Sequence, residues 1–222
     1  MQTKGSAILF SEMTPGADFA EEFHRWYDEE HIPIRMDCPG FVSAQRYGRT
    51  DRDGFLAVYE LDDAAVLSSP PYKVIKDTPS ERTAWMLKNV AGFTRYLASE
   101  TSVQVRDGID RPMDAHILYA VAFNVPDEAA EDFDSWYETE HVPLLMECED
   151  WLMVRRFRVT DGVPETFTHL ALHYLADMRA LSSPAREKAR KTPWRNRLAA
   201  NEWFKASYTT FQKHGRRQVG RG

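Results

Sequence analysis

Glu30 and His31 are two ionisable residues side by side on an otherwise apolar helix face. On a helical wheel of residues 18–32, at about 100° per residue, Glu30 falls in the middle of the sector that Phe23 and Trp26 define. His31 falls at the edge of the same face. Because a carboxylate that points into a core costs several kcal/mol unless it is paired or hydrogen-bonded, the pattern indicates a polar pocket behind this helix.

The chemistry that this pair suggests is acid–base catalysis. A partly buried glutamate has a raised pKa and histidine titrates near neutral pH, so the two can exchange protons with a substrate. Pro33 predicts a break or bend near Ile32, which places His31 at a helix end whose carbonyls favour a cationic imidazole. We expect His31 to move the proton, and Glu30 to orient it and tune its pKa.

Three neighbouring side chains are candidates for holding a ligand at this pocket. Tyr27 could bind an oxygen through its hydroxyl, and Trp26 could form a wall for a flat ligand. Arg46, on the next predicted strand, could bind a carboxylate. Structural roles are the alternative. Glu30 could bridge to Arg46, His31 could bond a carbonyl at the helix end, and Trp26 could be an ordinary core residue.

The whole constellation recurs 110 residues later. The two halves register without a gap over residues 20–46, and rare Trp, His and Cys residues coincide. Farther along, the offset is 114, where a Leu-Ser-Ser-Pro sequence and a Thr-Pro pair recur. This agreement predicts a tandem duplication. The second copy adds the catalytic candidates Tyr137, Glu140 and His141, and the substrate-binding candidates Trp136, Arg156 and His173, the last standing where the first copy has Tyr59.

The histidines and cysteines do not form a recognisable metal-binding pattern. Four histidines gather in the second half, but their spacing matches no zinc signature: His116, His141, His169 and His173. Cys38 and Cys148 occupy equivalent places in the two halves, and we interpret them as free, structural thiols. We therefore predict no metal site and no cofactor.

Each half is expected to follow the order β-α-β-β-α-β. Alternating or continuous apolar runs predict the strands 6–10, 41–47, 55–61 and 93–97, and then 116–123, 151–159, 168–175 and 208–212. Asp18 with Glu21, and Asp127, are the expected caps of the first helix of each copy. A second helical region begins after Asp63 or Asp177, is broken by Ser-Pro and restarts at a Thr-Pro pair, with Thr78 and Thr192 as caps and Glu81 completing a capping box in the first copy.

These elements predict an α+β fold of two ferredoxin-like βαββαβ repeats. We expect the first repeat at residues 1–100, a linker at 101–113, the second repeat at 114–213 and a disordered basic tail at 214–222. A four-stranded sheet covered by helices on one face leaves the other face bare, and a second copy can cover it. The two repeats should therefore form one intramolecular α/β barrel.

Composition excludes several classes of function. The 222-residue chain has a net charge of -6 with acids and bases interspersed, so it offers no basic stripe for nucleic acid or an anionic membrane. No apolar run approaches the ~20 residues of a membrane span, and residues 7–10 are too short for a signal peptide. We expect a cytoplasmic protein that acts on a small-molecule substrate. Its two repeats would form an internal pseudo-dimer, and two chains could associate further as a homodimer.

The helix-one motif resembles a known family. Phe23-x-x-Trp26-Tyr27-x-x-Glu30-His31-x-Pro33, followed by Pro39-Gly40-Phe41 and Arg46-Tyr47, is similar to the EthD-like branch of the dimeric α/β-barrel superfamily. The resemblance covers residues 5–98 and 114–212, although the second half lacks the Pro-Gly pair. It implies the barrel fold, a ligand between sheet and helices, and an acid–base role for His31 and His141. Enzymes of the superfamily include cofactor-free isomerases, dehydratases, cyclases, decarboxylases and oxygenases, and also haem enzymes.

The leading hypothesis is a cofactor-independent lyase or isomerase that acts on a small aromatic or cyclic acid by His/Glu acid–base catalysis. A non-catalytic small-molecule-binding or stress-response protein is the first alternative, and it would be favoured by salt bridges from Glu30 and Glu140 to Arg46 and Arg156. A haem- or metal-dependent oxygenase is the second. Either half, or both, could hold the working site.

Overall fold

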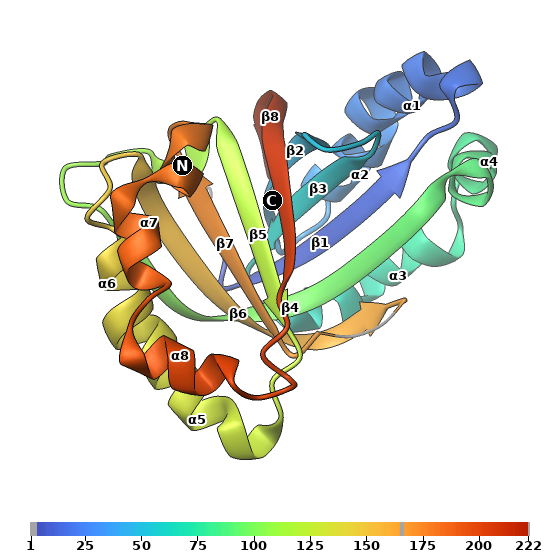
Figure 1. The fold of residues 1–222 in the computed structure, drawn as a ribbon. Helices are drawn as coiled ribbons and strands as arrows, with labels where there is room; N and C mark the ends of the chain where they lie inside the picture. The colour runs from blue at the N-terminus through green and yellow to red at the C-terminus, as the bar shows by residue number, and fades with distance from the viewer. Residues whose placement is uncertain (1–3, 165–166, 222) are drawn as a thin grey trace. The chain divides into compact units, whose positions relative to one another are not determined.

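The computed structural model describes residues 4–164 and 167–221. The chain divides into two compact units (Figure 1). The first contains the chain up to Ser99, a short segment that starts at Thr160, and the end of the chain from His214. The second contains the chain from Glu100 to Val159 and most of the remainder to Lys213.

The first unit has a four-stranded antiparallel sheet in the order β2-β3-β1-β4. Its central strand β1 pairs with β3 on one side and β4 on the other, and β2 pairs with β3. The strands are β1 (Ala7–Thr14), β2 (Phe41–Arg49), β3 (Phe55–Leu61) and β4 (Ala91–Val105). β4 is much longer than predicted and takes up part of the expected linker.

The second unit repeats this order as β6-β7-β5-β8, again antiparallel throughout. Its strands are β5 (Ile117–Phe123), β6 (Trp151–Val163), β7 (His169–Leu175) and β8 (Ser207–Val219). β8 runs on past the predicted end of the repeat. The expected disorder of residues 214–222 therefore does not hold for His214–Val219, which are strand, while residue 222 lies outside the described part of the chain.

Helices cover one face of each sheet, and Figure 1 shows α5 to α8 gathered on one side of β5, β6 and β7. The core of the first unit joins Phe23, Trp26 and Tyr27 of the first helix to the strands through Leu9 and Tyr59. The second core uses the repeated residues Phe133, Trp136 and Tyr137. The apolar helix sector seen in the sequence is thus the surface that packs on the sheet.

The first helix does not end at its proline. α1 (Ala20–Trp26) continues through a π-helical turn (Tyr27–His31) into α2 (Pro33–Met36), and the Ile32 amide donates to the Tyr27 carbonyl (3.0 Å). Because proline lacks an N–H and clashes with the carbonyl four residues earlier, one wider turn lets the helix continue. The helix therefore does not end near Ile32, where a break or a bend was predicted.

The second unit makes the same turn. α5 (Asp127–Trp136), a π-helical turn (Tyr137–His141) and α6 (Val142–Leu145) follow one another without interruption. The insertion therefore belongs to the repeated sequence and is no accident of one copy. π-helical turns of this kind are frequent at functional sites.

The remaining helices begin at side-chain caps. α3 (Pro70–Asp77) and α7 (Pro184–Ala189) start after Ser69 and Ser183, whose hydroxyls accept from the amides of Tyr72 and Arg186. α8 (Pro193–Ala199) starts after Thr192, as predicted. α4 (Glu81–Asn89) is capped by Ser80 instead of Thr78, so Glu81 is its first residue and no capping box forms.

The predicted caps of the first helices are also wrong. α1 begins after Phe19 and α5 after Pro126, and neither N-terminus has a side-chain cap bond. A short 3-10 turn (Ala17–Phe19) takes up the residues that the Asp18–Glu21 spacing assigned to the first helical turn. Asp63 and Asp177 do cap, but they cap 3-10 turns, Ala64–Ser68 and Met178–Ser182.

Candidate functional site

A cavity of about 250 Å³ lies within the first unit, beside the first helix. It is lined from the helix side by Glu30, His31 and Arg35, and from the sheet by Tyr59 of β3 and Arg95 of β4. Apolar residues make up much of the remaining wall, including Leu9, Ile34, Ile75 and Phe93. The cavity therefore combines apolar walls with a few polar groups, as small-molecule sites do.

His31 is buried at this cavity, with 4% of its surface exposed. Its ring packs against Trp26 (centroids 4.1 Å apart) and Tyr27 (4.9 Å), and its Nδ1 makes no hydrogen bond within the described residues. Burial, together with the positive charges of Arg35 and Arg46, holds the pKa of His31 well below its usual value. The imidazole is therefore neutral near pH 7, contrary to the cationic form expected at a helix end.

Arg35 accounts for part of this difference. Its Nη1 donates to the His31 carbonyl (2.6 Å), so the guanidinium satisfies the carbonyl that a cationic imidazole was expected to face. The same guanidinium lies 5.7 Å from the centre of the Tyr59 ring, and its Nε has no hydrogen-bond partner in the described chain. Arg35 was not among the site residues predicted from the sequence.

Tyr59 is a buried residue that sequence reasoning missed as a site candidate. It is 1% exposed, and its hydroxyl makes no hydrogen bond of normal geometry within the described residues, although it lies near enough to the Tyr27 hydroxyl to oppose the rise in the pKa of Tyr27. The Tyr27 hydroxyl bonds the Met13 sulfur (3.7 Å). Burial raises the pKa of Tyr59 well above its usual value, so its hydroxyl stays protonated. The sequence did carry a signal for Tyr59, because it aligns with His173, a site candidate of the second copy.

Among the described residues, the Glu30 carboxylate bonds groups other than the His31 ring. Its carboxylate accepts hydrogen bonds from the hydroxyls of Ser80 and Thr83 (2.7 Å to Thr83) at the start of α4. Although burial opposes ionisation, these hydrogen bonds and the nearby Arg82 lower the pKa of Glu30. The expected raised pKa is therefore wrong, because hydroxyl donors outweigh the burial.

Glu140 plays the same part in the second unit, where it accepts from the Thr192 hydroxyl (2.6 Å) at the cap of α8. Each repeated glutamate thus ties the π-helical turn to the N-terminus of the last helix. These hydrogen bonds explain why a carboxylate lies in the apolar sector of the first helix in both copies. The contact holds the π-helical turn in place.

Arg46 does not line the cavity of His31, and Arg156 does not line the corresponding cavity of the second unit. Arg46 borders a separate cleft of about 640 Å³ with Asp28, Pro33 and His214. Arg46 pairs with Asp28 (3.1 Å) and contacts His24 (2.8 Å), and its guanidinium lies 4.5 Å from the centre of the Tyr27 ring. Arg156 likewise bonds Asp134 and lies 4.8 Å from the Tyr137 ring. Both arginines hold the first helix on the sheet, so neither is available to a carboxylate ligand at those cavities.

The two tryptophans of the motif are placed differently. The Trp26 indole donates to the Thr83 hydroxyl (2.9 Å) and the residue is fully buried, so it and Tyr27 support the cavity from behind without lining it. Trp136 and Tyr137 do line a cavity in the second unit. The Trp136 Nε1 is buried there without a partner among the described residues.

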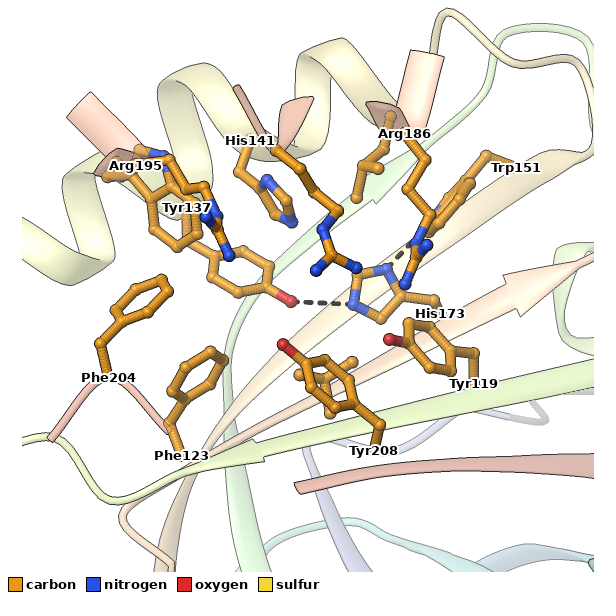
Figure 2. A pocket seen from close by; sticks show the side chains of 14 residues that line it. Tyr119, Phe123, Tyr137, His141, Trp151, His173, Arg186, Arg195, Phe204 and Tyr208 are labelled. Atoms are coloured by element: carbon orange, nitrogen blue, oxygen red, sulfur yellow. Dashed lines mark hydrogen bonds between the residues drawn. The ribbon is translucent and has the colours of Figure 1, made fainter. Parts of the chain in front are cut away.

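That second cavity is smaller, about 40 Å³, and His141 and His173 also line it (Figure 2). Burial lowers the pKa of His141 to about 3 and that of His173 well below its usual value, so both imidazoles are neutral. Glu140 and Arg156, which were expected at this site, do not line it.

A hydrogen-bonded chain fixes the tautomer of His173, as Figure 2 shows. The Trp151 Nε1–H donates to His173 Nδ1 (3.1 Å), and His173 Nε2 lies 2.8 Å from the Tyr137 hydroxyl. Because indole nitrogen only donates, Nδ1 accepts and the proton of the neutral ring sits on Nε2. Nε2–H therefore donates to the Tyr137 oxygen, which leaves the Tyr137 proton directed elsewhere.

The described residues contain no group of three or more His, Cys, Asp or Glu that could hold a metal ion. Cys38 is buried and Cys148 partly buried, and both are free thiols. Burial raises the pKa of Cys38, which favours the unreactive thiol form. Neither cysteine lines the two cavities described above.

Comparison with known proteins identifies the class of fold but does not identify the function. A family model described as "Domain of unknown function (DUF4286)" matches residues 116–216. No curated protein matches the sequence. Among the described residues, no helix has the length and apolar character needed to traverse a membrane.

Several solved structures resemble the chain along nearly its whole length. An anthrone oxidase-like protein has a TM-score of 0.68 at 11% identity, covering 100% of this chain and 97% of its own. A "Putative monooxygenase" from Fusobacterium nucleatum has a TM-score of 0.61 at 10% identity, covering 97% and 95%. A mutant chlorite dismutase from Candidatus Nitrospira defluvii has a TM-score of 0.56 at 6% identity, covering 94% and 91%. These relatives are dimeric α/β-barrel proteins, and this chain shares that class of fold.

A haem group, the second alternative that the sequence left open, does not fit the cavity of His31. That cavity, at about 250 Å³, is below the ~300–1,000 Å³ of ordinary small-molecule sites, and haem exceeds most of their ligands in size. Both nitrogens of His173 are engaged, by Trp151 and Tyr137. No catalytic step is therefore derived through haem.

Proposed function

We propose that this chain is a small-molecule-processing α/β-barrel enzyme whose working site is the cavity of the first unit, and that it acts as a lyase or isomerase on a small cyclic or aromatic acid. One observation carries the proposal. A single cavity collects a neutral histidine, a tyrosine hydroxyl and an arginine, each with a buried polar atom that makes no hydrogen bond in the described chain: His31, Tyr59 and Arg35. Buried polar atoms are normally paired, so a ligand is the natural partner.

The chemistry follows from the charge of each group. The neutral imidazole of His31 has a lone pair and acts as the general base. A positive charge on this buried ring is costly, so proton transfer is favoured only when the substrate becomes negative at the same time. The Tyr59 hydroxyl and the Arg35 guanidinium stabilise that negative charge on a substrate oxygen. His31 then returns the proton to a different atom, which completes an isomerisation or an elimination.

The other candidates take supporting parts in this proposal. Glu30 holds the π-helical turn against α4 and so positions His31, while Trp26 and Tyr27 form the packed layer behind it. In the second unit, Tyr137 and His141 line the smaller cavity, where His173 Nε2 already donates to the Tyr137 oxygen and no counterpart of the Arg35 guanidinium is present, since Leu145 stands at that position. We therefore assign turnover to the first unit.

We also propose that the two units are ferredoxin-like repeats that pair as one internal α/β barrel. The strand order β2-β3-β1-β4, repeated as β6-β7-β5-β8, supports this, as does a likeness to solved structures that spans the whole chain. A cytoplasmic location and further association as a homodimer remain part of the proposal.

The test is turnover of a panel of hydroxylated aromatic and lactone acids, followed by product analysis, with wild type and the variants His31→Ala, His141→Ala and the double variant. We expect His31→Ala to lower the turnover rate by at least about 100-fold, which is the usual range for loss of a general base. His141→Ala should keep most of the wild-type rate. Unchanged turnover in the double variant would refute the mechanism. Ligand binding without turnover would instead favour a binding protein.

A further inference from the structure

Three arginines line the second cavity without a carboxylate to neutralise them. Arg186, Arg190 and Arg195 all reach it, and no Asp or Glu is among its lining residues. Within the described residues, none of the three has a salt bridge, whereas Arg156 and Arg197 of the same unit are both paired. Arg186 donates to the Leu181 carbonyl (2.8 Å), but no carboxylate of the described residues neutralises any of the three charges, and such a cluster at one cavity attracts an anion.

The other polar groups of this cavity are also donors. Because His173 donates to the Tyr137 oxygen, the Tyr137 hydroxyl proton is free to bond a ligand. The Trp136 Nε1–H has no partner within the described chain. Figure 2 shows the hydroxyls of Tyr119 and Tyr208 directed into the same space as the guanidinium groups. A cavity in which donors predominate and no carboxylate is present suits a ligand rich in acceptor oxygens.

The inner walls add a preference for shape. The rings of Tyr119 and Tyr208 are stacked, with centroids 5.9 Å apart and planes only 4° from parallel. Phe123 and Phe204 form a second aromatic wall, 5.1 Å apart, and Arg195 lies over Phe204. The inner cavity holds about 40 Å³, and the three arginines also border an outer cleft of about 370 Å³. The one carboxylate that lines this outer cleft, that of Glu187, is paired with Lys191. A small anion with a flat apolar part fits such walls.

The first copy has only one positive charge at the equivalent positions. When the two units are registered on the helix caps Ser69 with Ser183 and Ser80 with Thr192, the counterparts of the three arginines are Tyr72, Lys76 and Thr83. All three counterparts line the cavity of the first unit. Equivalent positions therefore face a cavity in both units, but only the second copy carries three positive charges there.

We propose that the second unit binds a small organic carboxylate, with its carboxylate group held by Arg186, Arg190 and Arg195 and its flat apolar part against the tyrosine and phenylalanine rings. The carboxylate accepts from the guanidinium groups and from the Tyr137 hydroxyl. This site is separate from the cavity of His31, and the proposal does not depend on the reaction assigned there.

The test is calorimetric titration of the full-length protein with benzoate at low salt, beside benzamide as a neutral compound of the same shape. We expect benzoate to bind and benzamide not to bind measurably. Arg190→Met and Arg195→Met should each weaken benzoate by about 10-fold or more, because hydrogen bonds to charged groups are the strong ones. Arg197→Met is the matched control, because it removes one positive charge from α8, the helix that carries Arg195. Arg197 pairs with Asp132 outside the cavity, so this variant should change the affinity little.

Three results would overturn the proposal. Benzoate and benzamide could bind equally, which would make the site apolar and indifferent to charge. Inorganic phosphate could bind where benzoate does not, which would make it an inorganic anion site. Benzoate affinity could fall with Arg35→Met in the first cavity but not with Arg190→Met, which would place the ligand in the other unit. The Arg35 variant also separates this result from a failure of the proposed reaction, which turns on His31.

Discussion

At the scale of single residues, the protein keeps several ionisable side chains neutral by burial. His31 and His173 are at most 4% exposed, and Tyr59 is 1% exposed. Burial lowers the pKa of the two histidines and raises the pKa of Tyr59, so it favours the uncharged form of all three. These residues are costly to charge, which suits a base that is neutral before it takes a proton.

His31 should make stability depend on pH. Its folded pKa lies well below the unfolded value near 6.5, so the unfolded state binds the extra proton as pH falls. This contribution is present above about pH 6.5 and is lost at about 1.4 kcal/mol per pH unit below it. We expect His31→Gln to lose less stability than wild type between pH 6.5 and pH 5 in urea unfolding. Parallel curves for the two proteins would contradict the buried, neutral state.

Tyr59 should show opposite effects on stability and function. Its hydroxyl is buried without a partner in the described chain, so Tyr59→Phe removes an unsatisfied group and should leave the melting temperature unchanged or raise it slightly. The same variant should lose turnover, since the hydroxyl stabilises the substrate oxygen. A clear loss of stability in thermal melts would mean that the hydroxyl has a structural partner.

At the scale of elements, the π-helical turn and its glutamate were only half visible in the sequence. The wheel placed Glu30 in an apolar sector and correctly indicated polar partners behind the helix. It did not identify them, because Ser80 and Thr83 come from α4, some 50 residues later. A break or a bend was predicted because the residue before a proline disfavours the α conformation, whereas the π-helical turn accommodates the proline by changing the helical period.

The docking of Glu140 on Thr192 can be measured by a double-mutant cycle. Glu140→Ala and Thr192→Ala should each cost about 1–3 kcal/mol, since each removes one partner of a partly buried hydrogen bond and Thr192 also caps α8. We expect a coupling energy of about 0.5–3 kcal/mol between them. The exposed pair Glu187–Lys191 is the control and should couple by less than about 1 kcal/mol. Equal coupling in both pairs would reduce the glutamate contact to a surface interaction.

At the scale of the whole molecule, the duplication was the most predictable feature. The repeated Trp-Tyr-x-x-Glu-His motif predicted two copies with the same order of elements, and both units have it. The extent of the copies was less predictable. The end of the chain completes the first unit, because β8 continues to Val219, and its basic composition gave no sign of this. The arginine cluster was also missed, because Arg186 belongs to α7, Arg195 to α8, and Arg190 lies between the two helices.

The end of the chain should therefore stabilise the first unit. Gln45 donates to the His214 carbonyl (3.0 Å), the Gly220 amide donates to the Val42 carbonyl (2.8 Å), and Arg221 pairs with Asp37 (3.1 Å). We expect a chain that ends at Lys213 to lose several degrees in melting temperature, at about 1 kcal/mol for each lost hydrogen bond. A tail that is disordered in solution would instead leave the melting temperature unchanged.

The central claim is that His31 abstracts a proton in the first cavity, and hydrogen–deuterium exchange tests it without knowledge of the full reaction. Enolisable cyclic acids are incubated in D₂O with wild type, His31→Gln and His141→Gln, and deuterium at the acidic carbon is followed by NMR. The account predicts enzyme-dependent exchange for at least one acid, lost in His31→Gln and kept in His141→Gln. Exchange that survives in His31→Gln would contradict it, as would exchange lost only in His141→Gln.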